Sequence, residues 1–167
     1  MKDKFDKVFE LMQASFPKDE YRDYNSQKQL LSIPCYRLIT KMDSDDNLVG
    51  FIATWQTENF SFIEHFAVNP NLRGKGIGSE MLEDFIKNSS KPIILEVELP
   101  TDIISKKRIS FYKRHGFVLN EFKYFQMPLR KDSQPIQLYL MSLPKPLKEE
   151  EFEKIKSSIH QKIYGVN

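Results

Sequence analysis

The stretch NPNLRGKGIGSEML, residues 69–82, is the most informative part of this sequence. Three glycines stand at alternate positions directly behind Arg73: Gly74, Gly76 and Gly78. From Ile77 onward, apolar residues recur at helical spacing. Because glycine costs about 1 kcal/mol in a helix relative to alanine, this cluster indicates that something must approach the backbone closely where the helix begins.

Two common nucleotide-binding patterns do not fit the stretch. A P-loop needs a glycine where Asn69 stands, and the dinucleotide fingerprint needs its third glycine one residue later than Gly78. The remaining pattern, Arg73-x-x-Gly76-x-Gly78 between a strand and a helix, still suits an anion. The N-terminus of a helix has unpaired N–H groups and a positive dipole end, glycine lets an anion approach them, and Lys75 adds charge. The alternative is a turn that binds nothing.

Outside this stretch, helical and strand patterns alternate along the chain. Apolar residues at helical spacing predict amphipathic helices over these ranges: 3–16, 22–32, 77–86, 102–115 and about 147–164. Segments rich in β-branched and aromatic residues predict strands over these ranges: 35–43, 48–58, 60–68, 92–99, 117–127 and 134–143. This alternation predicts one mixed domain of the α/β (α+β) class over residues 1–167.

Composition limits the classes of function. The 25 basic and 23 acidic side chains give a net charge of +2, which argues against a nucleic-acid-binding arm. The single cysteine, Cys35, excludes a disulfide framework and a cysteine-rich zinc site. His115 and His160 lack the spacing of metal ligands, so no metal is expected. Because no signal peptide and no apolar run of about 20 residues is present, we expect a cytoplasmic protein with no membrane partner.

Two segments together resemble a known family. FAVNPNLRGKGIGSEML, residues 66–82, is similar to the coenzyme A pyrophosphate loop of the GNAT family, the Gcn-related N-acetyltransferases. The pattern of that loop is Arg/Gln-x-x-Gly-x-Gly/Ala behind a strand. SFYKRHGF, residues 110–117, is similar to the end of the family's fourth helix. The resemblance implies a central, mostly antiparallel sheet that splays between IEHFAV (63–68) and LEVEL (95–99) and is flanked by helices.

The resemblance also implies how acetyl-CoA would bind as co-substrate. The pantetheine arm would pair with the backbone of one strand at Phe66, Ala67 and Val68. The pyrophosphate would lie on the turn and on the first N–H groups of the helix, which come from these residues: Arg73, Gly74, Lys75, Gly76, Ile77, Gly78 and Ser79. Ser105 is a further cofactor candidate, although the family often has asparagine there. Arg108 also departs from the family, which often has alanine, and no strand is evident before the first helix.

The reaction implied by the resemblance is direct attack of an amine on the thioester, without a covalent enzyme intermediate. Tyr112, at the family's tyrosine position, would give a proton to the departing thiolate, unless it only packs in the core. A backbone N–H near Phe66 would stabilise the carbonyl oxygen. Glu64 is the predicted base because it shares strand parity with Phe62 and Phe66. His65 has a suitable ordinary pKa of about 6.5 but is expected on the opposite face. A water relay, or no dedicated base at all, would also satisfy the pattern.

Glu96 and Glu98 share one face of the LEVEL strand and are candidates for binding a cationic acceptor, or for an ion-paired strand end. The sequence therefore predicts an acetyl-CoA-dependent N-acetyltransferase that acts on a primary amine. A non-catalytic acyl-CoA sensor is the alternative from another class, and a different acyl donor or an oxygen acceptor are alternatives within the enzyme class. The identity of the acceptor and the oligomeric state, a homodimer included, stay open.

Overall fold

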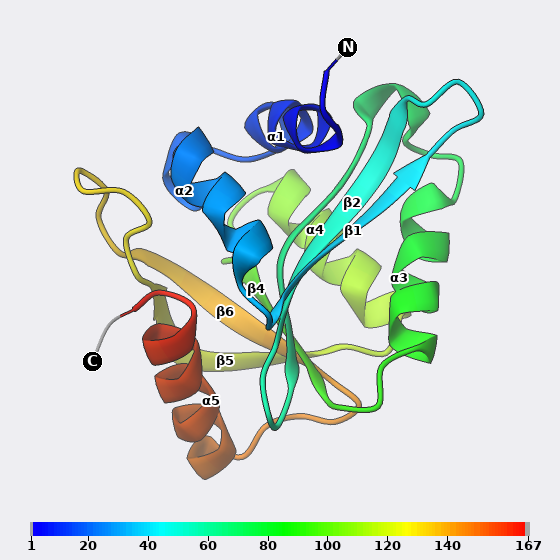
Figure 1. Cartoon of the computed structure of the whole chain (residues 1–167). Coiled ribbons are helices and arrows are strands. Elements are labelled where there is room, and N and C mark those ends of the chain that lie inside the picture. Colours follow the sequence, from blue (N-terminus) through cyan, green and yellow to red (C-terminus); the bar gives the residue numbers. More distant parts are fainter. Residues whose placement is uncertain (1, 166–167) are drawn as a thin grey trace.

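Helices and strands follow one another along the chain as the apolar spacing predicts (Figure 1). The computed structural model describes residues 2–165, so residues 1, 166 and 167 of the predicted domain lie outside the described part. The α-helices within it are α1 (Lys4–Ser15), α2 (Tyr24–Gln29), α3 (Ile77–Lys87), α4 (Ile103–Arg114) and α5 (Glu149–Lys162). The strands are β1 (Tyr36–Met42), β2 (Leu48–Gln56), β3 (Ser61–Val68), β4 (Ile93–Glu98), β5 (Val118–Gln126) and β6 (Ile136–Leu143).

The strands form one sheet of six in the order β1-β2-β3-β4-β6-β5. Every neighbouring pair is antiparallel except β3 and β4, which run parallel. Helices α1, α2 and α5 cover one face of the sheet, and α3 and α4 cover the other (Figure 1). The predicted fold, a mixed α/β domain with a mostly antiparallel sheet flanked by helices, is confirmed.

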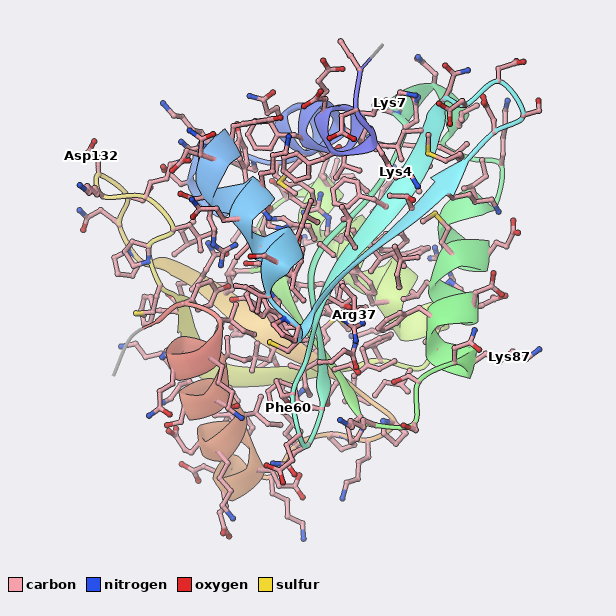
Figure 2. All side chains as sticks on the ribbon, viewed as in Figure 1. Lys4, Lys7, Arg37, Phe60, Lys87 and Asp132 are labelled. Atoms are coloured by element: carbon pink, nitrogen blue, oxygen red, sulfur yellow. The ribbon has the colours of Figure 1, made fainter. Side chains whose placement is uncertain are left out.

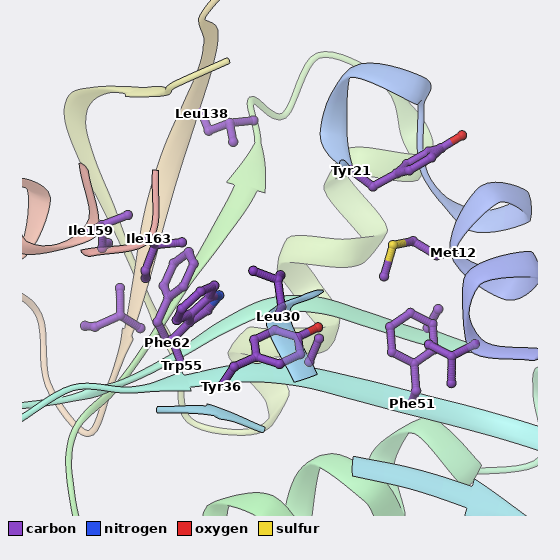
Figure 3. Packing of buried hydrophobic residues seen from close by; sticks show 14 of the residues in the cluster. Met12, Tyr21, Leu30, Tyr36, Phe51, Trp55, Phe62, Leu138, Ile159 and Ile163 are labelled. Carbon is purple, nitrogen blue, oxygen red and sulfur yellow. The ribbon is translucent and has the colours of Figure 1, made fainter. Parts of the chain in front are cut away.

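Two hydrophobic clusters hold these layers together, one on each face of the sheet. On the α1, α2 and α5 face, Figure 3 shows Trp55 and Phe62 of the sheet beside Ile159 and Ile163 at the end of α5. Phe62 and Ile159 are fully buried, and burying an aromatic or branched side chain contributes about 1.5–3 kcal/mol. The C-terminal helix is therefore part of the core.

Element boundaries agree with the sequence prediction except in the second helix. The predicted helix 22–32 is α2 followed by a 3₁₀ turn over Leu30–Ser32, because Pro34 disfavours a helical conformation for the residue before it and the chain must turn into β1. The amphipathic helix expected at about 147–164 is α5. Charged residues outside the core point outward. Figure 2 shows this for Lys87 at the end of α3 and for Asp132 in the β5–β6 loop.

Two irregularities of β3 position the functional site. Ala53 of β2 pairs with His65 and Thr54 pairs with Ile63, so Glu64 is the extra residue of a β-bulge. On its other side, β3 pairs with β4 at three positions only, of which Ile63 opposite Leu95 is the last. Beyond that pair the two parallel strands form no further ladder pairs within the described residues, and side chains of both strands line the space between them.

Candidate active site

The bulge changes which face of the sheet the β3 side chains occupy. With strict alternation, Phe62 and Phe66 would lie on the same face. Instead, Phe62 belongs to the cluster beneath α1 and α5, whereas Phe66 packs with the cluster beneath α3 and α4. The parity argument for Glu64 is therefore wrong, because two residues of a bulge oppose one residue of the partner strand.

Glu64 and His65 consequently point toward the same side, against the prediction that they face opposite ways. Trp55 of the α1-side cluster donates from Nε1 to Oε2 of Glu64 at 2.9 Å. The His65 ring packs edge-on against Phe16, which follows α1, with ring centroids 4.9 Å apart. Both residues therefore contact side chains of the α1 face.

Glu64 is held in a buried ion pair. Nη1 of Arg22 lies 2.7 Å from its Oε1, and the two side chains are 10% and 2% exposed. Nη2 of Arg22 also donates to the carbonyl of Ile163 at 3.2 Å. Burial raises the pKa of Glu64, but the charge of Arg22, the nearby His65 and the hydrogen bonds from Trp55 and Arg22 together outweigh this and hold the pKa below its ordinary value. A carboxylate that is buried, ion-paired and doubly hydrogen-bonded is a weak proton acceptor.

His65 is neutral and has one free ring nitrogen. Its Nε2 lies 2.7 Å from the carbonyl oxygen of Glu20, so this nitrogen carries the proton. Burial lowers the pKa of His65 against the opposing effect of Glu64. Within the described residues, the buried Nδ1 has no hydrogen-bond partner. His65 lines the space between β3 and β4.

The glycine stretch forms a turn followed by an uncapped helix. Gly74 and Gly76 have φ of +80° and +77°, the left-handed region that favours glycine, and neither would bring a Cβ near other atoms. Gly76 is the N-cap of α3 and offers no side-chain cap, so the first N–H groups of the helix stay available. Only Gly78 of the three glycines lies in the first helical turn. A Cβ atom added there would meet Phe66 and Phe111 at ordinary contact distance.

A cleft of about 550 Å³ runs along this turn, between β3, α3 and α4. Most of the predicted cofactor residues line it: Phe66, Ala67, Val68, Arg73, Gly74, Gly76, Ile77, Gly78 and Ser79. Uncapped amides, an arginine and an open cleft fit a coenzyme A pyrophosphate.

Lys75 and Ser105 are the two predicted cofactor residues that are not among the lining residues of the cleft. Lys75 is exposed. Ser105 is 1% exposed, and its Oγ accepts from the N–H of Asp102 at 3.1 Å in the capping box of α4. These contacts occupy Ser105 in starting the helix, so its predicted cofactor contact has no support from the geometry.

Tyr112 lies where two cavities meet. It lines the cleft beside the glycine turn and also a second cavity of about 60 Å³ between β3 and β4. Burial raises the pKa of Tyr112 to about 12, although nearby Arg108 opposes the shift. The hydroxyl is therefore protonated at neutral pH and is available as a proton donor.

The second cavity, which we call the acidic cavity, is lined by four carboxylates: Glu20, Glu64, Glu96 and Glu98. Glu96 accepts hydrogen bonds from two hydroxyls, Tyr124 at 2.8 Å and Tyr164 at 2.6 Å. Burial raises the pKa of Glu96 to about 7 against these hydrogen bonds. The structure thus brings the predicted Glu96 and Glu98 into the same cavity as Glu64.

Several residues of this site have no signal in the sequence. Burial and the charge of Glu98 raise the pKa of Glu20 to about 7. Nη1 of Arg108 lies 3.4 Å from Oε1 of Glu98, and Arg108 lines both cavities. Arg22 is 42 residues from Glu64, so only the fold pairs them. Of these residues, only Arg108 could be noticed in the sequence, because the family often has alanine at its position.

Metal-binding clusters and membrane-spanning helices are both absent from the part of the chain that the structure describes. No group of three or more histidine, cysteine, aspartate or glutamate side chains in residues 2–165 is arranged to hold a metal ion. None of the described helices combines the length and the apolar character needed to cross a bilayer.

Comparisons with known proteins agree with this geometry. A family model described as an acetyltransferase (GNAT) domain matches residues 38–119. A search of curated protein sequences finds no match. Two solved structures show the same fold. The ribosomal-protein-S18-alanine N-acetyltransferase from Escherichia coli has 20% identity, a TM-score of 0.61, and coverage of 87% of this chain and 90% of its own. An aminoglycoside 6'-N-acetyltransferase complexed with coenzyme A has 18% identity, a TM-score of 0.61, and coverage of 86% and 93%.

A third solved structure is more similar in sequence as well. It is a putative acetyltransferase from the GNAT family from Bacteroides thetaiotaomicron, with 36% identity and a TM-score of 0.90. The match covers 98% of this chain and 93% of that chain. Similarity of this degree over nearly the full length, together with the glycine turn and its cleft, shows that this chain belongs to the GNAT family of acetyltransferases.

Proposed function

We propose that this protein transfers the acetyl group of acetyl-CoA to a primary amine by direct attack of the amine on the thioester. The observation that carries the proposal is the position of Tyr112, which lines both the cleft beside the glycine turn and the acidic cavity. Acetyl-CoA in the cleft and an amine in the acidic cavity would meet at this residue. The membership of the GNAT family supports acetyl transfer in general.

The chain's own residues supply the proton transfers that the reaction needs. The amine must first lose a proton, its nitrogen then forms a bond to the carbonyl carbon, and the bond from that carbon to sulfur breaks. Tyr112 gives its hydroxyl proton to the departing thiolate, and the second proton that the nitrogen loses as the amide forms restores the Tyr112 hydroxyl. A backbone N–H of β3 near Phe66, in the part of the strand that within the described residues no longer pairs with β4, donates to the carbonyl oxygen as it gains charge.

Two carboxylates are candidates for the base that deprotonates the amine. Glu64 is the residue assigned from the sequence, but its side chain is 2% exposed and paired with Arg22, so it would act only through a water. Glu96 lines the same cavity, and its pKa of about 7 suits proton transfer at neutral pH. We propose Glu96 as the base, with Glu64 orienting Arg22, which in turn holds the carbonyl of Ile163.

The test is turnover of acetyl-CoA with a panel of primary amines, an alcohol and a peptide with a free N-terminus, followed by thiol release and by the mass of the product. Thiol release together with an acetylated amine supports the proposal. Coenzyme A binding without thiol release from any acceptor would indicate a non-catalytic sensor. Acetylation of the alcohol alone would indicate an O-acetyltransferase, and turnover only with a longer acyl donor would indicate an acyltransferase of different donor preference.

A further inference from the structure

The acidic cavity carries more negative than positive charge. Arg22 neutralises Glu64, and Arg108 lies beside Glu98. Within residues 2–165, neither of the other two carboxylates, Glu20 and Glu96, forms an ion pair. Two carboxyl groups therefore line the cavity without an ion-pair partner, with only the charge of Arg108 acting on Glu20 from further away, and the field of like charges favours a cation there.

Two buried polar atoms of the same cavity also have no partner among the described residues. They are Nδ1 of His65 and Nε2 of Gln126, in residues that are 2% and 6% exposed. Buried polar groups in native proteins are nearly always hydrogen-bonded, so an unpaired one indicates a ligand or water that completes it. The lone pair of His65 accepts from an N–H group, and rotation of the Gln126 carboxamide presents either its oxygen or its nitrogen. Both can therefore serve an ammonium group.

Apart from Arg108 and Tyr112, the remaining lining residues of the cavity are apolar: Phe16, Ile63, Phe66, Leu95, Val97 and Leu138. The cavity volume of about 60 Å³ is several times the space of about 10–15 Å³ that one water needs. A small cavity lined by both carboxylates and apolar side chains fits a short aliphatic chain that carries positive charge. Its size excludes an acceptor molecule that is bulky around the reacting amine.

On the basis of the proposed function, we propose that the acceptor is a small aliphatic molecule with two amino groups. One amino group is acetylated beside Tyr112, while the second, as an ammonium, is held by Glu20. The reacting amine must give up its charge before it attacks, so it cannot balance both unpaired carboxylates. A second ammonium stays charged throughout the reaction and remains a counterion for Glu20 after the first amine has lost its proton.

The test compares 1,4-diaminobutane with 1-aminobutane, which has the same carbon chain and lacks the second amine. Each is titrated by calorimetry into the full-length protein saturated with coenzyme A, so the measurement does not depend on turnover. We expect the diamine to bind about tenfold more tightly than the monoamine, or by about 1.4 kcal/mol. Glu20→Gln should reduce this ratio, and Glu58→Gln, the same change in the exposed β2–β3 turn, should preserve it.

Equal dissociation constants for the two amines in the wild-type protein would overturn the inference, and so would no binding of either amine. Tighter binding of a peptide with a free N-terminus than of the diamine would overturn it too. The proposed function is judged separately, by acetylation of any amine. A preference for the diamine without acetylation would therefore reject the proposed reaction and support the cation site. Acetylation without a preference for the diamine would support the reaction and reject the cation site.

Discussion

The cleft beside the glycine turn and the acidic cavity differ in how they are made, although they meet at Tyr112. The cleft is formed largely by consecutive residues, from Phe66 to Ser79, and offers backbone groups at a turn and a helix N-terminus. The cavity is formed by side chains of β3, β4, β5, β6, α4 and the segment after α1. A site made of backbone groups can be recognised from a short sequence motif, whereas a site made of side chains from distant segments cannot.

The largest expected effect is on the cleft alone. Gly76→Glu should abolish coenzyme A binding because it places a negative charge beside the uncapped amides of α3. The φ of +77° makes any side chain there cost about 1–2 kcal/mol, so the fold should survive with reduced stability. Gly76→Gln has the same size and strain without the charge, and calorimetry should show it binding coenzyme A more tightly than Gly76→Glu. Unchanged affinity in Gly76→Glu would remove the basis for placing the cofactor here.

The second prediction concerns the residue that the two regions share. Tyr112→Phe should lower kcat by about 10²-fold and leave the affinity for acetyl-CoA nearly unchanged, because only the proton donor is lost. The ring keeps its packing against Phe111 and Phe117, so thermal stability should stay close to wild type. Steady-state kinetics with one fixed amine decides this. Equal turnover would mean that the thiolate obtains its proton elsewhere or needs none.

The third prediction separates the two carboxylates within the acidic cavity. Glu96→Gln should lower kcat/KM by about tenfold at neutral pH and recover as pH rises, because more of the amine is then already neutral. Glu64→Gln leaves Arg22 buried without its partner, which typically costs about 3–5 kcal/mol, so its main effect should be on stability. pH–rate profiles and melting temperatures of both variants are the measurements. If Glu64→Gln loses the acidic limb and Glu96→Gln overlays wild type, Glu64 is the base.

The smallest effect expected is a change in how stability depends on pH. The pKa of Glu96 is raised from 4.5 to about 7 in the folded protein, so between these values the folded state holds a proton that the unfolded state releases. Stability should therefore fall as pH rises through this window. Glu96→Gln removes this contribution, so melting curves recorded at several pH values should show its stability falling less steeply than that of wild type, by at most about 3 kcal/mol across the whole window.

The comparison in that experiment is between wild type and variant at each pH, because other groups also titrate. Glu20 acts in the same direction as Glu96, and the lowered pKa of His65 acts in the opposite direction, but both are present in each protein. Glu58→Gln controls for the loss of one carboxylate on the surface. Parallel curves for wild type and Glu96→Gln would show that Glu96 titrates alike in the folded and unfolded protein.

Much of the fold could be predicted because its signals are local. Apolar spacing indicates each strand and helix, and Asp102 with Ser105 forms a cap within four residues. The bulge at Glu64 could not be predicted, because it depends on the register that β2 and β3 adopt together. One extra residue placed Phe62 and Phe66 on different faces, and it brought Glu64 and His65 to the same side.

The sequence by itself determined the glycine turn, the order of the elements and the place of Tyr112, since left-handed backbone, helix starts and apolar periodicity are properties of short segments. Tertiary structure alone decided the charge of the acidic cavity. Arg22 reaches Glu64 across 42 residues, and Tyr164 reaches Glu96 across 68. Burial, the partner of each carboxylate and hence its pKa arise only when distant segments meet, because electrostatic energy depends on separation and local dielectric, not on position along the chain.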